Sequence, residues 1–485
     1  MLFRSIGNLT TTQVTVLTAA QVGAISATQV KGIETTDLPE LSTTQLSQLT
    51  TTQLTAFSTT QIQALTATQF AGFSTTLVAS LTGTQMGALS TGNLQALTSA
   101  QIAGLSLTQV KGLTATQVTD LTATQVAALA ATQMAVLSAT QIKGLEDADI
   151  IALTASQLAG LTATQIGALE TTDLQAFATS QISALTATQL GGLTVTQVGD
   201  LLDTQVEALA ASQIALLSAT QLKGFETTDL QTLTTTQLSQ LSAAQVGAFT
   251  TSQVAAFTPA QLSGLSTTQV SGLTSTQLGS VETADLQSMT TTQIASLSAT
   301  QVKGFTATQI GDLTTAQVAV LTSTQIAVLS ATQIKGFETA DLVTLTGTQL
   351  AGLTTTQVSG LQTTSLQALA DTQVAALSTT QVKSLTATLV SALTEAQAQA
   401  LTATQLGALS TTQLKGLETT DLTALSVTQL TLLTATQVAG LTTTQIQALT
   451  DVQFASLNAT QIGGLSATQI SALDDTDLQG LTATQ

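Results

Sequence analysis

The pattern on which this chain is built is visible in Leu121-Thr122-Ala123-Thr124-Gln125-Val126-Ala127-Ala128, one of sixty octads that begin between residues 9 and 481. We number the positions of an octad 1 to 8, so that Leu121 is position 1 and Ala128 is position 8. Position 1 always holds Leu, Ile, Phe, Val or Met, and no insertion or deletion breaks the register. This strict register predicts a solenoid, because a stack in which each unit packs only on its neighbours tolerates a change of length poorly.

The other positions of the octad are also restricted. Position 6 is Val, Ile or Leu in most copies, with Ala398 the clearest departure, so each octad offers two apolar anchors. Position 8 is usually Ala or Gly, which allow two backbones to approach closely. Position 2 is nearly always Ser or Thr, and position 5 is nearly always Gln. Apart from a group of octads with Asp, the departures at position 5 are Leu77, Asn93, Ser365 and Leu389.

Positions 2 to 6 contain a helix start signal. Ser or Thr, followed three residues later by Gln and then by an apolar residue, is the capping-box pattern. The anchors at position 6 and at position 1 of the next octad are three residues apart, on one face of a helical turn. The sequence therefore predicts an all-α solenoid with one very short helix per octad, over about positions 3 to 8. Such helices are too short to be stable alone, so stacking must hold them.

A β-solenoid with about two octads per coil is the alternative. Thr, Val and Ile favour strands, and Gln at position 5 would form an internal amide ladder. However, coil corners usually need Gly, Asn, Asp or Pro, and the chain has two prolines and three asparagines. Positions 1 and 6 also have opposite parity, so they cannot share one face of an unbroken strand. These features favour the helical solenoid.

The chain is expected to consist of a lead-in, residues 1–8, and one continuous array, residues 9–485. The lead-in lacks the long apolar core of a secretory signal. Variant octads recur at a spacing of 192 residues, or 24 octads, as Lys31, Lys223 and Lys415 show. This spacing indicates duplication of a 24-octad block.

Charged residues occupy particular positions of the octad. All eight lysines fall at position 7, which predicts a solvent-facing column; they are Lys31, Lys111, Lys143, Lys223, Lys303, Lys335, Lys383 and Lys415. Wherever position 5 is Asp, position 2 is acidic too. The pairs are Glu34/Asp37, Glu146/Asp149, Glu170/Asp173, Glu226/Asp229, Glu282/Asp285, Glu338/Asp341, Glu418/Asp421 and Asp474/Asp477.

These paired acids have two interpretations. They could cap and charge the first helical turn, where the helix dipole favours anions. They could also bind calcium, for which the candidates are Glu34, Asp37, Glu226, Asp229, Glu418 and Asp421. Two carboxylates are too few for a calcium cage unless neighbouring coils contribute, and the pairs lie at least three octads apart. The capping interpretation is therefore favoured.

Composition excludes several classes of function. Cys, His, Trp and Tyr are absent, which removes disulfides, the commonest metal ligand and the usual neutral-pH proton shuttle. The net charge of −18 disfavours nucleic acid and anionic membranes as partners. No run of about 20 apolar residues could span a bilayer. With no accompanying base or nucleophile beside the repeated acids, we expect neither an enzyme nor a cofactor.

Octads such as Leu113-Thr114-Ala115-Thr116-Gln117-Val118 resemble the octad tracts of very large proteobacterial exoproteins of the "heme utilization or adhesion" type. The resemblance covers essentially the whole chain and implies a secreted adhesin on the bacterial surface. Its heme part finds no support here, because His, Cys and Tyr are absent and the four Met are scattered.

The expected function is structural and adhesive: an extracellular rod or filament on the bacterial surface. The sequence stops in mid-octad at Gln485, without a capping unit, and an uncapped array could join head to tail into a filament. The alternative is a binding module that uses the repeated outer face, either for ice through the Thr-x-Thr element or for calcium-dependent adhesion.

Overall fold

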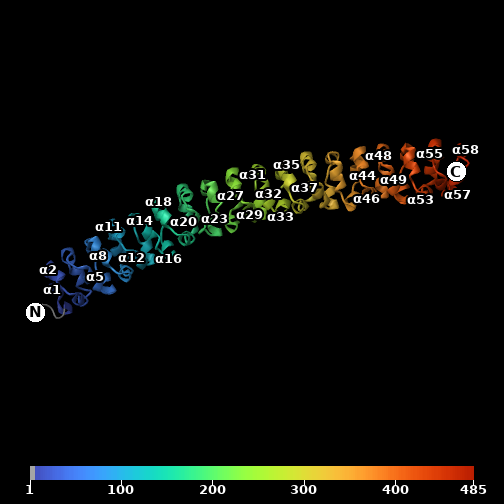
Figure 1. Ribbon diagram of the computed structural model, residues 1–485. Coiled ribbons are helices and arrows are strands. Elements are labelled where there is room, and N and C mark those ends of the chain that lie inside the picture. Colours follow the sequence, from blue (N-terminus) through green and yellow to red (C-terminus); the bar gives the residue numbers. More distant parts are fainter. Residues whose placement is uncertain (1–5) are drawn as a thin grey trace. The chain divides into compact units, whose positions relative to one another are not determined.

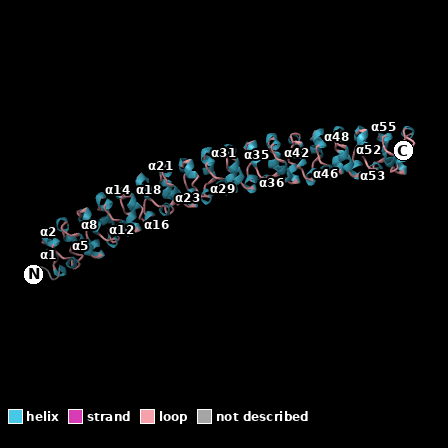
Figure 2. Ribbon diagram, in the orientation of Figure 1, coloured by secondary structure: helices cyan, strands magenta, loops and turns pink. Residues whose placement is uncertain are grey.

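The computed structural model describes residues 6–485, and these residues are helical (Figures 1 and 2). They form 58 α-helices and two short 3-10 helices, without a strand anywhere in the described part. The prediction of an all-α solenoid is confirmed, and the β-solenoid alternative is wrong for these residues. The reason is local: each octad forms a capped helical turn that engages most of its backbone N–H groups, so few remain to pair in a sheet ladder.

Each octad between residues 9 and 480 contributes one helix, from α1 (Thr11–Thr15) through α14 (Ala123–Ala128) to α58 (Asp475–Gln479). Every α-helix begins at position 3 and ends at position 6, 7 or 8. The octad at 33–40 differs, because it forms the 3-10 helix η2 (Leu38–Glu40) instead. Pro39 has no N–H to continue an α-helical ladder, which explains this exception.

The helix boundaries follow from the residues at positions 1 and 2. Thr122 caps α14 in the extended conformation, with φ −73° and ψ 152°, and its side chain accepts a hydrogen bond from the backbone N–H of Gln125. The helix ends at Ala128, and Leu129, which follows it, is extended again, with φ −67° and ψ 133°. Position 1 therefore lies between two helices, directly before the residue that caps the next one, as predicted.

Helices stack on the third helix along the chain. Examples are α9 (Gly83–Met86) on α12 (Leu107–Gly112) and α29 (Ala243–Ala248) on α32 (Thr267–Gly272). Hydrogen bonds between stacked segments join residues 25 to 31 positions apart. One coil therefore takes about three and a half octads.

The core consists of positions 1 and 6. Val126 and Leu129 are 1% and 3% exposed, and the same positions are buried along most of the chain. Burying one such aliphatic side chain contributes about 1.5–3 kcal/mol. Because each coil has only a few of these anchors, coils must share them with their neighbours, and an isolated octad has no core of its own.

Two compact units make up the chain, Met1–Leu241 and Ser242–Gln485. Within each unit the coils follow one another in chain order (Figure 1). The octad register continues in the sequence from one unit to the next. Of the expected lead-in, Ile6–Asn8 forms the 3-10 helix η1 with Ile6 buried, and residues 1–5 lie outside the described part.

Candidate functional site

The glutamine at position 5 connects each coil to the one before it. The side-chain oxygen of Gln125 accepts a hydrogen bond from the backbone N–H of Thr122 at 3.1 Å, which completes the capping box. Its amide nitrogen donates to the carbonyl oxygens of Leu94 at 2.8 Å and Leu97 at 2.9 Å. One side chain thus begins its own helix and closes the end of another helix one coil earlier.

The same arrangement recurs along both units. In unit 1, Gln189 donates to Leu158 and Leu161 at 2.6 and 2.9 Å. In unit 2, Gln357 donates to Ile326 at 2.8 Å, and also to Leu329. The last carbonyls of a helix have no partner within the helix, so these amides supply what each short helix lacks. Accordingly, no buried side-chain nitrogen or oxygen among residues 6–485 is left without a hydrogen bond.

The capping half of this role was predicted from the sequence, and the cross-coil half was not. A signal for it exists. Glu would serve a capping box as well as Gln does, yet Glu never occurs at position 5. Only an amide both accepts from its own helix and donates to the neighbouring coil. Asn93, one of the departures, keeps part of this function by donating to the carbonyl of Leu65 at 2.8 Å.

An aspartate at position 5 can accept the hydrogen bond of the capping box, but its carboxylate donates none to the preceding coil. Asp229 is 2% exposed, and its carboxylate accepts the backbone N–H of Glu226 at 3.0 Å. Asp421 does the same with Glu418 at 3.0 Å. The side chains of Glu226 and Glu418 are exposed. These two pairs lie at the starts of α27 (Thr227–Thr232) and α51 (Thr419–Ala424), where the aspartate accepts the backbone N–H but the glutamate side chain forms no capping hydrogen bond. Glu34 and Asp37 instead precede the 3-10 helix η2.

Most position-5 aspartates face position 3 of the octad three earlier, which lies in the preceding coil. The carboxyl of Asp203 lies close enough to that of Asp229 to raise its pKa. At four of the eight sites an acid occupies the facing position; these pairs are Asp147/Asp173, Asp203/Asp229, Glu395/Asp421 and Asp451/Asp477. At Asp37 the facing residue is Thr11, whose hydroxyl donates to the carboxylate at 2.8 Å.

The six calcium candidates lie in three separate octads. Glu34 is exposed beside buried Asp37, and the pairs Glu226/Asp229 and Glu418/Asp421 repeat this arrangement. Neighbouring coils do contribute a further carboxylate, from Asp203 or Glu395, because the octad three earlier lies in the preceding coil. Even so, no group of three or more Asp, Glu, His or Cys among residues 6–485 is arranged to hold a metal ion. Calcium binding stays a prediction, which melting with and without millimolar calcium tests.

Burial raises the pKa of most position-5 aspartates above the ordinary value of 3.8, and the neighbouring acids add to the effect. The residues are Asp149, Asp173, Asp229, Asp285, Asp341, Asp421 and Asp477. At Asp229 the pKa is raised to about 6. Burial is the main cause and the Asp203 carboxyl adds to it, whereas the hydrogen bond from the Glu226 N–H lowers the pKa.

Acid is expected to stabilise the fold. Because the pKa of Asp229 is higher in the folded chain than in the unfolded chain, the folded state binds the proton more tightly. This stabilisation is complete below about pH 4 and is lost as the pH rises through about 6. Thermal unfolding at pH 4, 5.5 and 7 should therefore give the lowest midpoint at pH 7.

Asp203→Thr provides the matched variant, because Thr11 occupies the equivalent place beside Asp37. Replacing the acid by a hydrogen-bond donor should stabilise the chain by about 1 kcal/mol at pH 7. It should also flatten the dependence of the midpoint on pH. A midpoint that is highest at neutral pH, or a variant less stable than the parent at pH 7, would show that the two carboxyls do not oppose each other.

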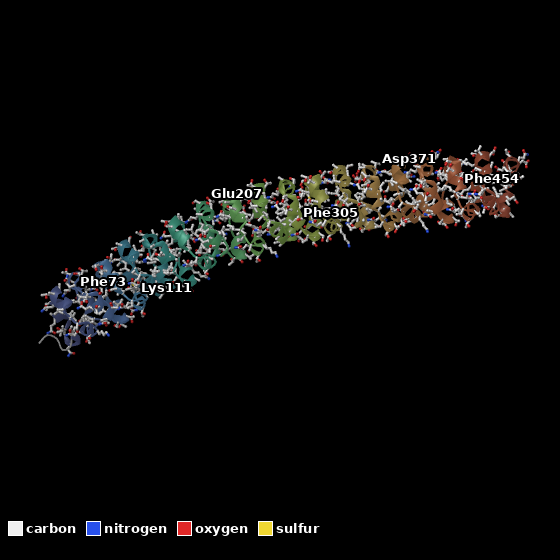
Figure 3. The ribbon with its side chains drawn as sticks, in the orientation of Figure 1. Phe73, Lys111, Glu207, Phe305, Asp371 and Phe454 are labelled. Atoms are coloured by element: carbon white, nitrogen blue, oxygen red, sulfur yellow. The ribbon has the colours of Figure 1, made fainter. Side chains whose placement is uncertain are left out.

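The lysine column is where the sequence predicted it. All eight lysines are exposed. In unit 1, Lys111 and Glu207 lie at opposite edges of the view in Figure 3.

Comparison with known families finds one repeat. The family model described as "ALTTAQ repeat" matches residues 30–67, 166–202, 222–259, 280–315 and 414–451. Each stretch is a little longer than one coil and contains one octad with paired acids, and together they cover less than half of the chain. The chain thus carries ALTTAQ repeats at five places. No curated protein matches it. None of the helices within residues 6–485 has the length and hydrophobicity to cross a bilayer.

Proposed function

We propose that this array of ALTTAQ-type octads is a structural and adhesive protein, displayed outside the cell on a bacterial surface, whose role is to provide length, stiffness and self-association. The observation that carries the proposal is the repeated amide link between coils. Gln117 bonds to Met86 and Leu89, and Gln125 bonds to Leu94 and Leu97. Such links make each coil depend on the next, so bending or extending a unit must break several hydrogen bonds at once.

The proposal assigns no catalytic role and no cofactor to the chain. The surface hollow beside Lys31, Glu34 and Gln61 is open to solvent and combines one base, one acid and an amide that already donates to carbonyls of the preceding coil. Such a hollow offers neither an activated nucleophile nor a place that excludes water. The location outside the cell follows from the resemblance to surface exoproteins, and is part of the proposal.

Electron micrographs of the purified chain test this role. We expect elongated particles, and filaments where particles join. Round, compact particles would contradict this role. Display of the chain on a bacterium that lacks adhesins tests the adhesive part: displaying cells should clump or bind a surface more than cells that display the same chain with its register broken by a four-residue insertion.

A further inference from the structure

Aspartate occurs at position 8 of the octad in three places, and each time it stands 23 residues before a lysine. In all three cases this lysine is followed by Gly, an apolar residue and Glu. The sets are Asp120/Lys143/Glu146 and Asp200/Lys223/Glu226 in unit 1, and Asp312/Lys335/Glu338 in unit 2. Because this spacing is not a multiple of eight, it indicates a contact between coils and not a variant of one octad.

The helices that precede the aspartate and the lysine of each set are stacked on one another. The stacked pairs are α13 (Ala115–Thr119) with α16 (Ala139–Ile142), α23 (Val195–Gly199) with α26 (Ala219–Leu222), and α37 (Ala307–Gly311) with α40 (Ala331–Ile334). Figure 1 labels α16, α23 and α37. In each pair the aspartate directly follows the first helix and the lysine directly follows the second. Both charges therefore lie at the carboxyl ends of two stacked helices.

Backbone contacts hold these helix ends close together. The glycine that follows the lysine packs on the first residue of the helix in the preceding coil. A Cβ at Gly336 would lie 2.5 Å from the carbonyl oxygen of Ala307, and a Cβ at Gly144 would lie 2.8 Å from that of Ala115. Only a residue without a side chain allows this approach, so the glycine is part of the set.

The backbone of each aspartate is held by a glutamine 25 residues earlier, at position 7. The side-chain amide of Gln95 donates to the carbonyl oxygen of Asp120 at 2.8 Å. The equivalent bonds, from Gln175 to Asp200 and from Gln287 to Asp312, measure 2.7 and 2.5 Å. The place of the aspartate is therefore fixed in the same way in all three sets.

The charged side chains of the set in unit 2 line a surface hollow. Asp312, Lys335 and Glu338 surround it, and Gly311 and Gly336 are among the small residues between them. The hollow has a volume of about 350 Å³ and is open to solvent. The lysine and the glutamate are exposed and the aspartate is partly exposed, as are their counterparts in unit 1. No ion pair joins the lysine to either acid in the described part of the chain, so all three charges are available to a partner.

The other five lysines lack part of this arrangement. Two of them are followed by glutamate in the same way, but no aspartate stands 23 residues earlier. The remaining three have neither acid, although they are exposed at the same position of the octad; they are Lys111, Lys303 and Lys383. The three complete sets are therefore a distinct group, and these last lysines are matched controls for them.

We propose that these three sets, which we call the mixed-charge sets, bind the mixed-charge sets of a second copy of this chain, with the lysines of each copy paired to the carboxylates of the other. Two arguments select this partner. Each set carries both signs of charge, so two copies are complementary in both directions, whereas the net charge of −18 repels a polyanion. In addition, two chains that run in the same direction present the two sets of unit 1 at the same spacing. Because one exposed ion pair contributes little, several must form together, and the recurrence of the set provides this.

The inference rests on the self-association in the proposed function and makes it specific, and a charge exchange between two chains tests it. Sedimentation velocity of the full chain at tens of micromolar should show a dimer. In one variant the bases are reversed, by Lys143→Glu, Lys223→Glu and Lys335→Glu. In the other the acids are reversed, by Asp120→Lys, Asp200→Lys and Asp312→Lys. Each variant alone should dimerise about tenfold more weakly than the parent, and an equal mixture of the two should recover the affinity of the parent to within about threefold.

Two comparisons separate pairing at these sets from a general effect of charge. The control variant, Lys111→Glu with Lys303→Glu and Lys383→Glu, changes the net charge as much as the base-reversed variant does and should stay within about twofold of the parent. Reversing the acids makes the chain less negative, so general repulsion alone would predict a tighter dimer for that variant and not a weaker one. Circular dichroism at 222 nm checks that each variant remains helical, and the base-reversed variant and its control decide the matter if the acid-reversed variant does not fold.

A parent chain that stays monomeric would overturn the pairing, and so would equal weakening by the base-reversed variant and its control. A base-reversed variant with a lower thermal midpoint and unchanged association would show that the lysines serve their own chain, and would overturn it too. Folded variants whose mixture stays as weak as each alone would do the same. A monomer that is still an elongated particle in micrographs would reject the pairing alone and leave the structural role standing, whereas round particles would reject that role.

Discussion

Replacing Gln125 by alanine is expected to destabilise its coil by about 3 kcal/mol. The substitution removes the acceptor for the Thr122 N–H and the donor to the carbonyls of Leu94 and Leu97, at a side chain that is only 3% exposed. Polar backbone groups left without a partner in the interior account for most of this cost, and the lost volume accounts for the rest.

Gln125→Leu separates the two contributions. Leucine fills the space and occurs naturally at position 5, at Leu77 and Leu389, but it forms no amide bonds. We expect it to cost less than alanine and still more than 1 kcal/mol. Gln63→Ala, at an exposed position 7, is the control and should be close to neutral. Hydrogen exchange is the measurement, because it resolves opening of single coils within a long array.

The expected pattern is faster exchange at residues 94–97 and 122–126 in the alanine variant, with distant coils unchanged. If Gln125→Leu were as stable as the parent, the amide hydrogen bonds would contribute little beyond packing. That result would contradict the stiffness that we infer from them.

Replacing Gly112 by alanine is expected to cost about 2 kcal/mol. A Cβ at Gly112 would lie 2.6 Å from the Cα of Gly83 in the preceding coil, and its contact with the Gly83 carbonyl oxygen would be closer still. Gly87 in turn approaches Gly112 itself, since a Cβ at Gly87 would lie 2.5 Å from the Gly112 carbonyl oxygen. Backbone stands against backbone here, so no side-chain rotation can relieve the overlap.

Gly92→Ala is the matched control for this prediction. Nothing lies within 4 Å of a Cβ at Gly92, although it is also a helical glycine, in α10 (Thr91–Gln95). Alanine there should stabilise the chain by up to about 1 kcal/mol through helix propensity. Thermal unfolding measures both variants. Equal midpoints for the two would show that α9 and α12 move apart at little cost, and that the close approach of coils is not a requirement of the fold.

The local structure of this protein was predictable from the octad alone. Thr122 and Gln125 form a capping box, Val126 and Leu129 lie on one helical face, and position 7 points to solvent, as the lysines indicate. These features depend on residues within a few positions of each other, where propensity and capping chemistry suffice. For the same reason the distinction between helix and strand could be drawn without knowing how coils stack.

The stacking could not be predicted in the same way, since it depends on which distant octads meet. Pairs of unusual residues in different octads of this sequence did indicate which octads meet. In six places a glycine at position 7 is followed 25 residues later by a glycine at position 8, and the backbones of the two glycines are in contact. These pairs are Gly87/Gly112, Gly167/Gly192, Gly199/Gly224, Gly247/Gly272, Gly279/Gly304 and Gly311/Gly336. Acids at position 3 likewise fall mostly 26 residues before a position-5 aspartate. A spacing that is not a multiple of eight is invisible while octads are compared position by position.

For the acids this difference changed the interpretation. In the sequence, pairs such as Glu226/Asp229 stand at least three octads from the next pair and look isolated. In the fold the octad three earlier lies in the preceding coil, so Asp203 lies close to Asp229 and Asp451 lies close to Asp477. The local structure of each octad can therefore be predicted from its eight residues. The contacts between octads form only when about three and a half octads have closed into a coil, because the length of the coil is set by how closely backbones pack and not by the repeat itself.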